Sequence, residues 1–281
     1  LTIRGAFMPH EHGKKRIAII GCGVIGSALA GFASRELKDK VSGIILWDIS
    51  PSVAAEVVSL IPQAETAVDM ADAVKRSDLA IEAAHPAAAR EALELAIRMG
   101  KDVMVMSVGG LLGSGELLKR ADKEGVRVLL PSGAIAGIDA IKAAAMAGIE
   151  NVTLTTIKSP ESLKSSTYLA LKGVDLASIN VDTVVFDGTV EEAVKAFPKN
   201  INVSAALAIA AGDTRLVRVK IMASPGAAAN IHEIEVKGPA GRMTTRCENV
   251  PSPGNPGTSH LAVLAAERTL KDYFSGVRIG T

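Results

Sequence analysis

The chain has 281 residues, 48% of them hydrophobic, and a formal net charge of +1. This length allows one large domain or two of ordinary size. The balanced charge gives no electrostatic reason to expect nucleic acid or an anionic membrane as a partner, and no apolar run reaches the roughly 20 residues of a membrane span. The first residues lack the apolar segment of a secretory signal, so we expect a cytoplasmic protein. Cys22 and Cys247 are too far apart to suggest a disulfide framework, and we predict no metal site.

The first predicted strand, residues 16–21, runs directly into a G-x-G-x-x-G turn formed by Gly21, Gly23 and Gly26. A strand, such a turn and a helix (here 24–37) are typical of a dinucleotide site. The first glycine permits the tight turn, the second lets the pyrophosphate approach the backbone, and the third lets the helix pack closely. The helix then directs its N-terminal N–H groups at the phosphates. The predicted cofactor contacts here are Gly21, Gly23, Val24, Ile25 and Gly26.

A second predicted strand, residues 44–48, ends in Asp48. This acidic residue follows the glycine turn at the roughly 20-residue distance expected for a group that binds the ribose hydroxyls. A carboxylate at this point would repel a 2′-phosphate. NAD is therefore the expected cofactor, with NADP as the alternative.

Strands and helices alternate as far as about residue 135. A helix begins at Pro51, and further helices are predicted over 69–74, 86–99 and 114–124. Between them lie apolar strands at 79–84, 102–106 and 126–130. This alternation predicts right-handed crossovers and an α/β fold with a Rossmann-type, doubly wound parallel sheet. We assign residues 1–138 to a dinucleotide-binding domain.

The pattern changes near Asp139. A helix over 139–147 leads to segments with a two-residue period, and further helices are predicted at 190–197 and 202–211. The segments are 151–158, 183–188, 214–222, 231–238 and 242–249. They predict a second, α+β domain over 139–257 with a mostly antiparallel, open-faced sheet. Catalytic and oligomerisation roles for this domain follow only from the family resemblance described below. A last helix, about 258–274, is expected to return to the first domain with residues 258–281.

Ligands of doubly wound sheets bind at the carboxyl ends of the strands. Three predicted loops lie there: 82–86, which includes Ala84 and His85; 107–110; and 131–139, which includes Ser132. The small residues of the third loop would let its backbone approach a ligand closely. Each loop is also consistent with an ordinary tight turn.

Hydride transfer from an amine or alcohol carbon requires a group that takes a proton. His232 lies in an alternating strand, on the same face as Ile234 and Val236. A histidine on an apolar face is either a packing residue or, where that face borders a cleft, a catalytic base. His85 is a rival, and spacing alone does not choose between them.

Several segments together resemble the L-aspartate dehydrogenase family. They are I-G-C-G-V-I-G at 20–26, E-A-A at 82–84, S-V-G-G at 107–110, P-S-G-A-I-A-G at 131–137, N-V-S-A-A-L at 202–207, N-I-H at 230–232 and E-N-V-P-S-P-G-N-P at 248–256. The first is shared by many oxidoreductases, whereas P-S-G-A-I-A-G and E-N-V-P-S-P-G-N-P are much more distinctive. The similarity extends over most of the chain.

The resemblance implies NAD- or NADP-dependent oxidation of L-aspartate, a dicarboxylic amino acid, to iminoaspartate. This product can hydrolyse to oxaloacetate and ammonia or supply quinolinate and NAD biosynthesis. By the same resemblance His232 corresponds to the active-site histidine, and Ala136 and Asn202 to cofactor contacts. His85 departs from the family pattern, where a small polar residue is expected. A homodimer is expected by analogy with the family.

Aspartate carries two carboxylates, which need cationic or hydrogen-bond-donating partners. We predict Ser132, Lys158 and Ser159 as substrate-binding residues. Further cations lie on the predicted strands of the second sheet: Arg215, Arg218, Lys220, Arg242 and Arg246. A neutral His232 with a pKa near neutrality would take the ammonium proton.

Two other functions fit a two-domain nucleotide-binding chain. One is a reductase of the homoserine dehydrogenase or dihydrodipicolinate reductase type. The other is a sensor that binds NAD(H) without catalysis.

Overall fold

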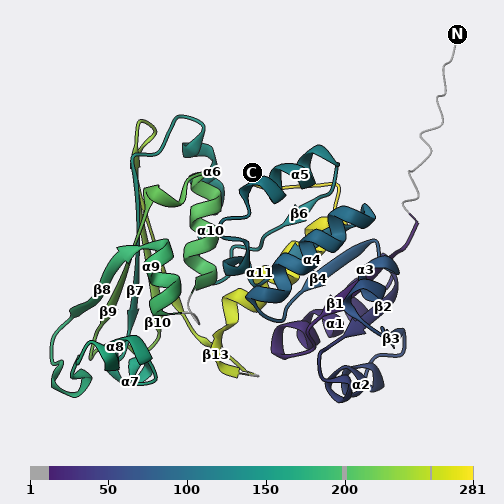
Figure 1. The fold of residues 1–281 in the computed structure, drawn as a ribbon, viewed down its shortest axis with the longest axis horizontal. Helices are drawn as coiled ribbons and strands as arrows, with labels where there is room; N and C mark the ends of the chain where they lie inside the picture. Colours follow the sequence, from purple (N-terminus) through teal and green to yellow (C-terminus); the bar gives the residue numbers. More distant parts are fainter. Residues whose placement is uncertain (1–12, 198–200, 254, 281) are drawn as a thin grey trace, which may run out of the picture.

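The computed structural model describes residues 13–197, 201–253 and 255–280. Its first unit is a parallel sheet with the strand order β3-β2-β1-β4-β5-β6 (Figure 1). The strands are β1 (Lys15–Ile20), β2 (Val41–Trp47), β3 (Ala64–Thr66), β4 (Leu79–Glu82), β5 (Asp102–Val105) and β6 (Val128–Leu129). The order reverses between β1 and β4, so the carboxyl ends of these two strands border the crevice where such sheets bind ligands. This confirms the predicted Rossmann-type sheet.

Helices cover both faces of this sheet. One face packs against α1 (Val24–Glu36), α2 (Pro51–Ser59) and α11 (His260–Tyr273), and the other against α3 (Met70–Lys75), α4 (Pro86–Met99) and α5 (Gly115–Lys123). Strand residues alternate between the two cores: Ile81 belongs to the first and Ala80 to the second. Strands buried on both faces explain the continuous apolar runs in the sequence.

The second unit is a sheet with the order β11-β10-β7-β9-β8. Its strands are β7 (Asn151–Lys158), β8 (Thr183–Thr189), β9 (Val217–Ala223), β10 (Asn230–Gly238) and β11 (Gly241–Asn249). The β7–β9 pair is parallel, and the other neighbouring pairs are antiparallel. The predicted mostly antiparallel sheet is therefore confirmed.

One face of the second sheet packs against helices. They are α6 (Ile138–Ala145), α7 (Pro160–Leu163), α8 (Thr167–Leu171), α9 (Val190–Ala196) and α10 (Ile201–Ala211). Leu154, Val219 and Ile234 point into this core because side chains alternate along each strand. The opposite side, which we call the open face, carries Thr153, Thr155, Lys220, Glu233, Glu235, Arg242 and Thr244.

The chain returns to the first unit at its carboxyl end. A short hairpin of β12 (Pro251–Ser252) and β13 (Asn255–Ser259) leads into α11 (Figure 1). Ala266 and Leu270 of α11 pack in the same core as Leu29 of α1. The helix begins at His260, two residues later than predicted, because residues up to Ser259 pair as a strand. This return agrees with the expectation that the last helix joins the first domain, while the domain boundaries at 138/139 and 257/258 stay predictions.

Tyr273, near the end of α11, fastens that helix to the amino-terminal edge of the first sheet. Its hydroxyl accepts a hydrogen bond from Lys15 Nζ at 2.7 Å and donates one to Asp102 Oδ2 at 2.9 Å. The guanidinium of Arg127 lies 4.5 Å from the ring centroid and also pairs with Asp102. These polar contacts therefore join α11 to the starts of strands β1 and β5.

The sequence prediction missed the three-residue edge strand β3 and the short helices α7 and α8. It also extended β9 too far. Residues 214–216 form the 3-10 turn η4 (Thr214–Leu216), because the Asp213 side chain accepts a hydrogen bond from the Arg215 N–H. Residues 1–12, and Gly254 within the E-N-V-P-S-P-G-N-P segment, lie outside the described residues.

None of the described helices has the length and hydrophobicity needed to cross a membrane. Among the described residues, no group of His, Cys, Asp or Glu side chains is arranged to hold a metal ion.

Candidate active site

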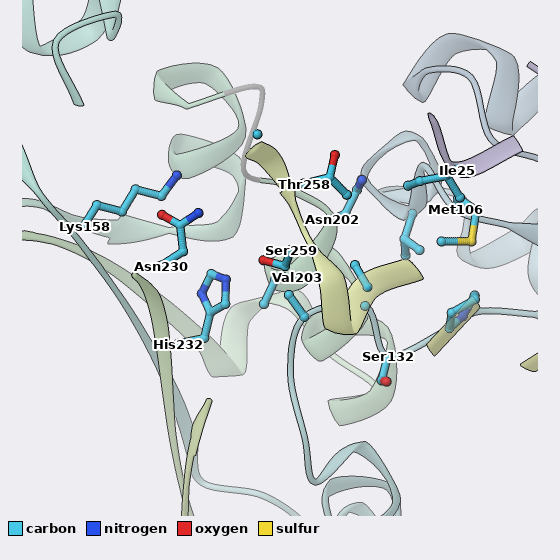
Figure 2. A pocket seen from close by; sticks show the side chains of 16 residues that line it. Ile25, Met106, Ser132, Lys158, Asn202, Val203, Asn230, His232, Thr258 and Ser259 are labelled. Carbon is cyan, nitrogen blue, oxygen red and sulfur yellow. The ribbon is translucent and has the colours of Figure 1, made fainter. Parts of the chain in front are cut away.

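A cavity of about 220 Å³ lies where the two units meet. The second sheet contributes Lys158, Asn230 and His232, and the first unit contributes Ile25 and Met106 from the opposite side (Figure 2). Strand β13 passes between them with Thr258 and Ser259 (Figure 2). The remaining lining residues are Val108, Pro131, Ser132, Gly133, Ala134, Asn202, Val203, Gly257 and Ala262. The site therefore draws on residues from almost the whole length of the chain.

The glycine turn has the geometry that a dinucleotide requires. Gly21 has a φ of +91°, which L side chains rarely adopt. A Cβ on Gly26 would lie 1.9 Å from the Gly21 carbonyl oxygen, so a side chain there would push α1 off the turn. A Cβ on Gly23 would meet nothing within 4 Å, which leaves its backbone open to a phosphate. The turn thus fits a bound pyrophosphate.

Asp48 is held against this turn. Its Oδ2 accepts a hydrogen bond from the Cys22 N–H at 2.8 Å, and its Oδ1 accepts one from the Ser50 N–H at 2.9 Å. The carboxylate therefore sits at the end of β2 beside the glycine turn, as predicted from its spacing. Burial and the nearby Asp48 raise the pKa of the Cys22 thiol to about 12, so this thiol stays protonated at neutral pH.

The loop after β4 is organised by a fully buried carboxylate. Glu82 accepts hydrogen bonds from the Ala84 N–H at 2.8 Å, the Ser107 N–H at 2.9 Å and the Ser107 hydroxyl at 2.8 Å. Burial raises the pKa of Glu82 despite these donors. His85 caps α4, since its Nδ1 accepts from the Ala88 N–H at 3.4 Å. Neither Ala84 nor His85 lines the cavity.

Asn202, at the start of α10, lines the cavity and joins the two units. Its Oδ1 accepts a hydrogen bond from the Gly109 N–H at 3.1 Å. Gly109 belongs to the 3-10 helix η1 (Val108–Leu111), which follows β5 and Ser107. This contact directs the amide oxygen towards Gly109, and the NH₂ group supplies two N–H donors for a ligand.

His232 lies on β10 with only 8% of its surface exposed, and it borders the cavity (Figure 2). It shares the inner face of Ile234 and Val236, as the alternation predicts, but sits at the end of the sheet that meets the first unit. Its Nδ1 lies 3.0 Å from the Thr156 hydroxyl. Burial and then the charge of Lys158 lower the pKa of His232 to about 4, not the near-neutral value expected from the sequence. The ring is therefore neutral at pH 7.

Lys158 and Ser132 line the same cavity, whereas Ser159 does not. Burial lowers the pKa of Lys158. Ser159 instead caps α7, where its hydroxyl accepts from the Ser162 N–H at 3.3 Å.

The other candidate cations lie away from the cavity. Arg218 pairs with Asp187, Arg242 with Glu235, and Arg246 with Glu233 and Glu248, all with exposed side chains. Arg215 pairs with Asp213, and Lys220 lies on the open face. Alternation explains the four cations on β9 and β11, because they and the buried core residues point to opposite sides of the sheet. Arg215 lies in the η4 turn before β9.

The third loop meets the cavity through Pro131, Ser132, Gly133 and Ala134, but Ala136 is exposed and does not line it. The Ala136 carbonyl accepts a hydrogen bond from the Thr245 hydroxyl at 3.2 Å.

Sequence reasoning missed four polar or sulfur-bearing residues of the cavity, namely Met106, Asn230, Thr258 and Ser259. Asn230 was detectable, because it lies two residues before His232 on the same strand face. Thr258 and Ser259 were not, because their place depends on the hairpin that brings β13 back between the units.

A doubly wound sheet with a dinucleotide turn, facing a second sheet that carries a buried histidine, defines a two-domain nicotinamide-dependent oxidoreductase. Known proteins refine this class. The family model described as "Aspartate dehydrogenase, C-terminal" matches residues 139–273, and that described as "Homoserine dehydrogenase, NAD binding domain" matches residues 21–131. L-aspartate dehydrogenase of Methanosarcina barkeri is 39% identical over 274 residues, covering 95% of this chain and 99% of that protein. The chain belongs to the aspartate dehydrogenase family.

Solved structures agree with this assignment. The crystal structure of aspartate dehydrogenase from Thermotoga maritima is similar with a TM-score of 0.76 and 27% identity, covering 95% of this chain and 100% of that one. A homoserine dehydrogenase from Thiobacillus denitrificans has a TM-score of 0.61 at 16% identity, covering 93% of this chain and 73% of that one. The second likeness extends to the fold alone.

Proposed function

We propose that this chain oxidises L-aspartate to iminoaspartate with NAD(P), and that His232 is its catalytic residue. The observation that carries the proposal is the buried, neutral imidazole of His232 in the cavity between the nucleotide-binding unit and the second sheet. The packing alternative for this histidine is disfavoured, because a ring used only for packing has no need of a cavity beside it.

The nucleotide's pyrophosphate would be held by the backbone of the glycine turn at Gly21, Gly23 and Gly26, together with the N-terminus of α1, and its ribose hydroxyls by Asp48. The NH₂ group of Asn202 would contact its nicotinamide half. When bound, the cofactor supplies the acceptor for a hydride from the substrate's α-carbon. Ala84, His85 and Ala136 do not line the cavity, and neither do Gly23 and Asp48, so the contacts of the first three residues stay predictions.

The protein's own residues provide the base that removes a proton from the substrate's ammonium group. Aspartate arrives as an ammonium, whose nitrogen has no lone pair to support loss of a hydride. A neutral His232 takes one proton from it and leaves an amine. Its pKa of about 4 makes the ring a weak base before substrate binds. The two substrate carboxylates bring negative charge beside Lys158, which raises the pKa of His232 towards the value that proton transfer needs.

The carboxylates would be bound by Lys158, with Ser132 as a further donor. Lys158 is suited to this because its ammonium is partly removed from water, where an ion pair is stronger than at the surface. Hydrolysis of the imine would give oxaloacetate and ammonia, and the intact imine would serve quinolinate and NAD biosynthesis.

The test is the absorbance of reduced nicotinamide after mixing the protein with NAD or NADP and one candidate substrate. L-aspartate is expected to produce an increase, whereas homoserine, glutamate and alanine are not. Turnover of homoserine in preference to aspartate would favour the homoserine dehydrogenase type. Tight binding of NADH with no turnover of any substrate would favour a sensor.

A homodimer formed through the second unit is also part of the proposal. The open face carries both signs of charge, with Arg242 beside Glu235 and Lys220 near Glu233. A surface of this kind is able to meet a second copy of itself across a two-fold axis. Light scattering during size-exclusion chromatography tests it, and a monomer at micromolar concentration would contradict it. A cytoplasmic location stays a prediction.

A further inference from the structure

Thr156 lies directly opposite His232 in the second sheet. Strands β7 and β10 are antiparallel, and the backbone register pairs these two residues. Both side chains are on the inner face, where 3% of Thr156 and 8% of His232 is exposed. The Thr156 Oγ1 and the His232 Nδ1 are 3.0 Å apart, which is hydrogen-bonding distance. The contact is therefore built into the pairing of two central strands.

The neighbouring strands β9 and β11 supply the other residues that flank Thr156 and His232. On the side away from His232, Thr156 is paired with Ile221 of β9, which is apolar. His232 is paired on its other side with Cys247 of β11. Lys158, two residues along from Thr156, is the charged group whose field acts on the ring. Since Nδ1 is taken up by Thr156, Nε2 is the ring nitrogen left for the cavity.

A neutral imidazole has one N–H and one lone pair, so the partner of one nitrogen decides the state of the other. If Thr156 accepts a hydrogen bond from Nδ1–H, Nε2 has the lone pair that a base requires. If Thr156 donates to Nδ1, Nε2 already bears a proton and is unable to take another.

We propose that Thr156 is the positioning residue for His232, and that its hydroxyl oxygen accepts a hydrogen bond from Nδ1–H and so directs the basic Nε2 into the cavity. This rests on the proposed function. In the step that it serves, an N–H bond of the substrate ammonium breaks, the electron pair stays on that nitrogen, and the proton forms a bond to Nε2. The Nδ1–H group keeps its hydrogen bond to the Thr156 oxygen throughout, so the imidazole ring does not have to turn during the proton transfer.

Three variants separate the effect of the Thr156 hydroxyl on His232 from the effect of side-chain size. Thr156→Val removes the hydroxyl at nearly constant shape, Thr156→Ser keeps it, and Thr155→Val makes the same change on the other face of the same strand. The valine at 156 is expected to lower kcat for aspartate by roughly 10- to 100-fold, as loss of a group that orients a reactive histidine does, with KM changed little. The serine restores kcat to within about threefold, and the valine at 155 leaves it unchanged.

The direct readout needs no turnover. Nitrogen-15 NMR of protein labelled at histidine, with the His232→Gln variant identifying the signal, reports which ring nitrogen bears the proton. The parent is expected to show Nδ1–H, and Thr156→Val is expected to lose this preference. A parent that shows Nε2–H overturns the proposal, and so does Thr156→Val with unchanged kcat and tautomer. Absence of aspartate turnover by the parent overturns the proposed function instead, while the NMR result still decides the role of Thr156.

Discussion

Glu82 receives two hydrogen bonds from a single residue, Ser107: one from its N–H at 2.9 Å and one from its hydroxyl at 2.8 Å. Glu82 ends β4 and Ser107 follows β5, so the buried carboxylate ties together two loops at the ligand-binding edge of the first sheet. Ser107 leads into η1, whose Gly109 N–H bonds Asn202. The position of Asn202 in the cavity thus depends on the Glu82 carboxylate, although Glu82 does not line the cavity.

Replacing Glu82 with glutamine should therefore weaken both the fold and cofactor binding. An amide NH₂ would face one of the main-chain N–H donors, and a buried donor left without an acceptor costs about 1–3 kcal/mol. The free energy of unfolding in urea is expected to fall by that amount, and NADH should bind less tightly in a fluorescence titration. Glu94→Gln, on the exposed side of α4, is the matched control. An unchanged unfolding curve for Glu82→Gln would contradict the account.

Lys158 is expected to bind substrate and not cofactor. Lys158→Met should raise the KM for aspartate by roughly tenfold or more, through loss of one charged contact, while the dissociation constant of NADH stays unchanged. Lys123→Met, at an exposed position in the last turn of α5, should alter neither. Equal effects of the two methionine variants would show that Lys158 acts only through the overall charge.

Asp48 should set the choice between the two cofactors. Because its carboxylate lies at the end of β2 beside the glycine turn, the parent should have a higher kcat/KM with NAD than with NADP. Asp48→Asn removes the charge but retains an acceptor for a main-chain N–H, and it should shift the ratio of the two kcat/KM values towards NADP. A parent that strongly prefers NADP would disprove this assignment.

The buried His232 should make stability depend on pH. Its pKa is lowered from 6.5 to about 4 in the folded protein. The unfolded chain therefore binds the proton first as the pH falls, and the stability contributed by the neutral ring is complete above pH 6.5 and lost on going down to about pH 4. By linkage the loss amounts to about 3 kcal/mol. Urea denaturation should show that His232→Gln loses less stability than the parent over this interval, and parallel losses would contradict it.

Tyr273→Phe should lower the stability of the protein and leave the structure of the cavity unchanged. The change removes the hydroxyl that bonds both Lys15 and Asp102, and hydrogen bonds to charged groups are worth about 1.5–3 kcal/mol each. Tyr273→Leu should cost more, because the ring faces Lys15 and Arg127 as well. Thermal unfolding measures both, and kcat at 25 °C should stay unchanged. A leucine variant as stable as the phenylalanine variant would show that the ring contributes little.

Local patterns predicted the long elements well. Helix 86–99 and strand 151–158 have the predicted bounds, because Pro86 begins the one and regular alternation defines the other. Alternation also placed His232 on the correct face. The three-residue strand β3 has too few residues to show a period.

The rest of the site depends on how distant strands pair and on how the end of the chain folds back between the two units. A local sequence pattern predicts neither. The Thr156–His232 contact follows from how β7 and β10 pair, and Ser259 reaches the cavity through the β12–β13 hairpin. Spacing did not choose between His232 and His85, and the family resemblance favoured His232; in the structure His85 caps α4 and His232 borders the cavity. Ser159, predicted to bind substrate, caps α7 and does not line the cavity, because a serine after a strand is equally suited to cap the next helix.

The most direct test of the central claim, that His232 of the second sheet takes the substrate's proton beside a nucleotide bound to the first, is a single-turnover experiment. Parent and His232→Gln, both saturated with NAD, are mixed with L-aspartate, and formation of reduced nicotinamide is followed. The account predicts a rate roughly 10²–10⁴-fold lower for the variant, the usual contribution of a general base, with NADH affinity preserved. A variant rate within about tenfold of the parent's would contradict it.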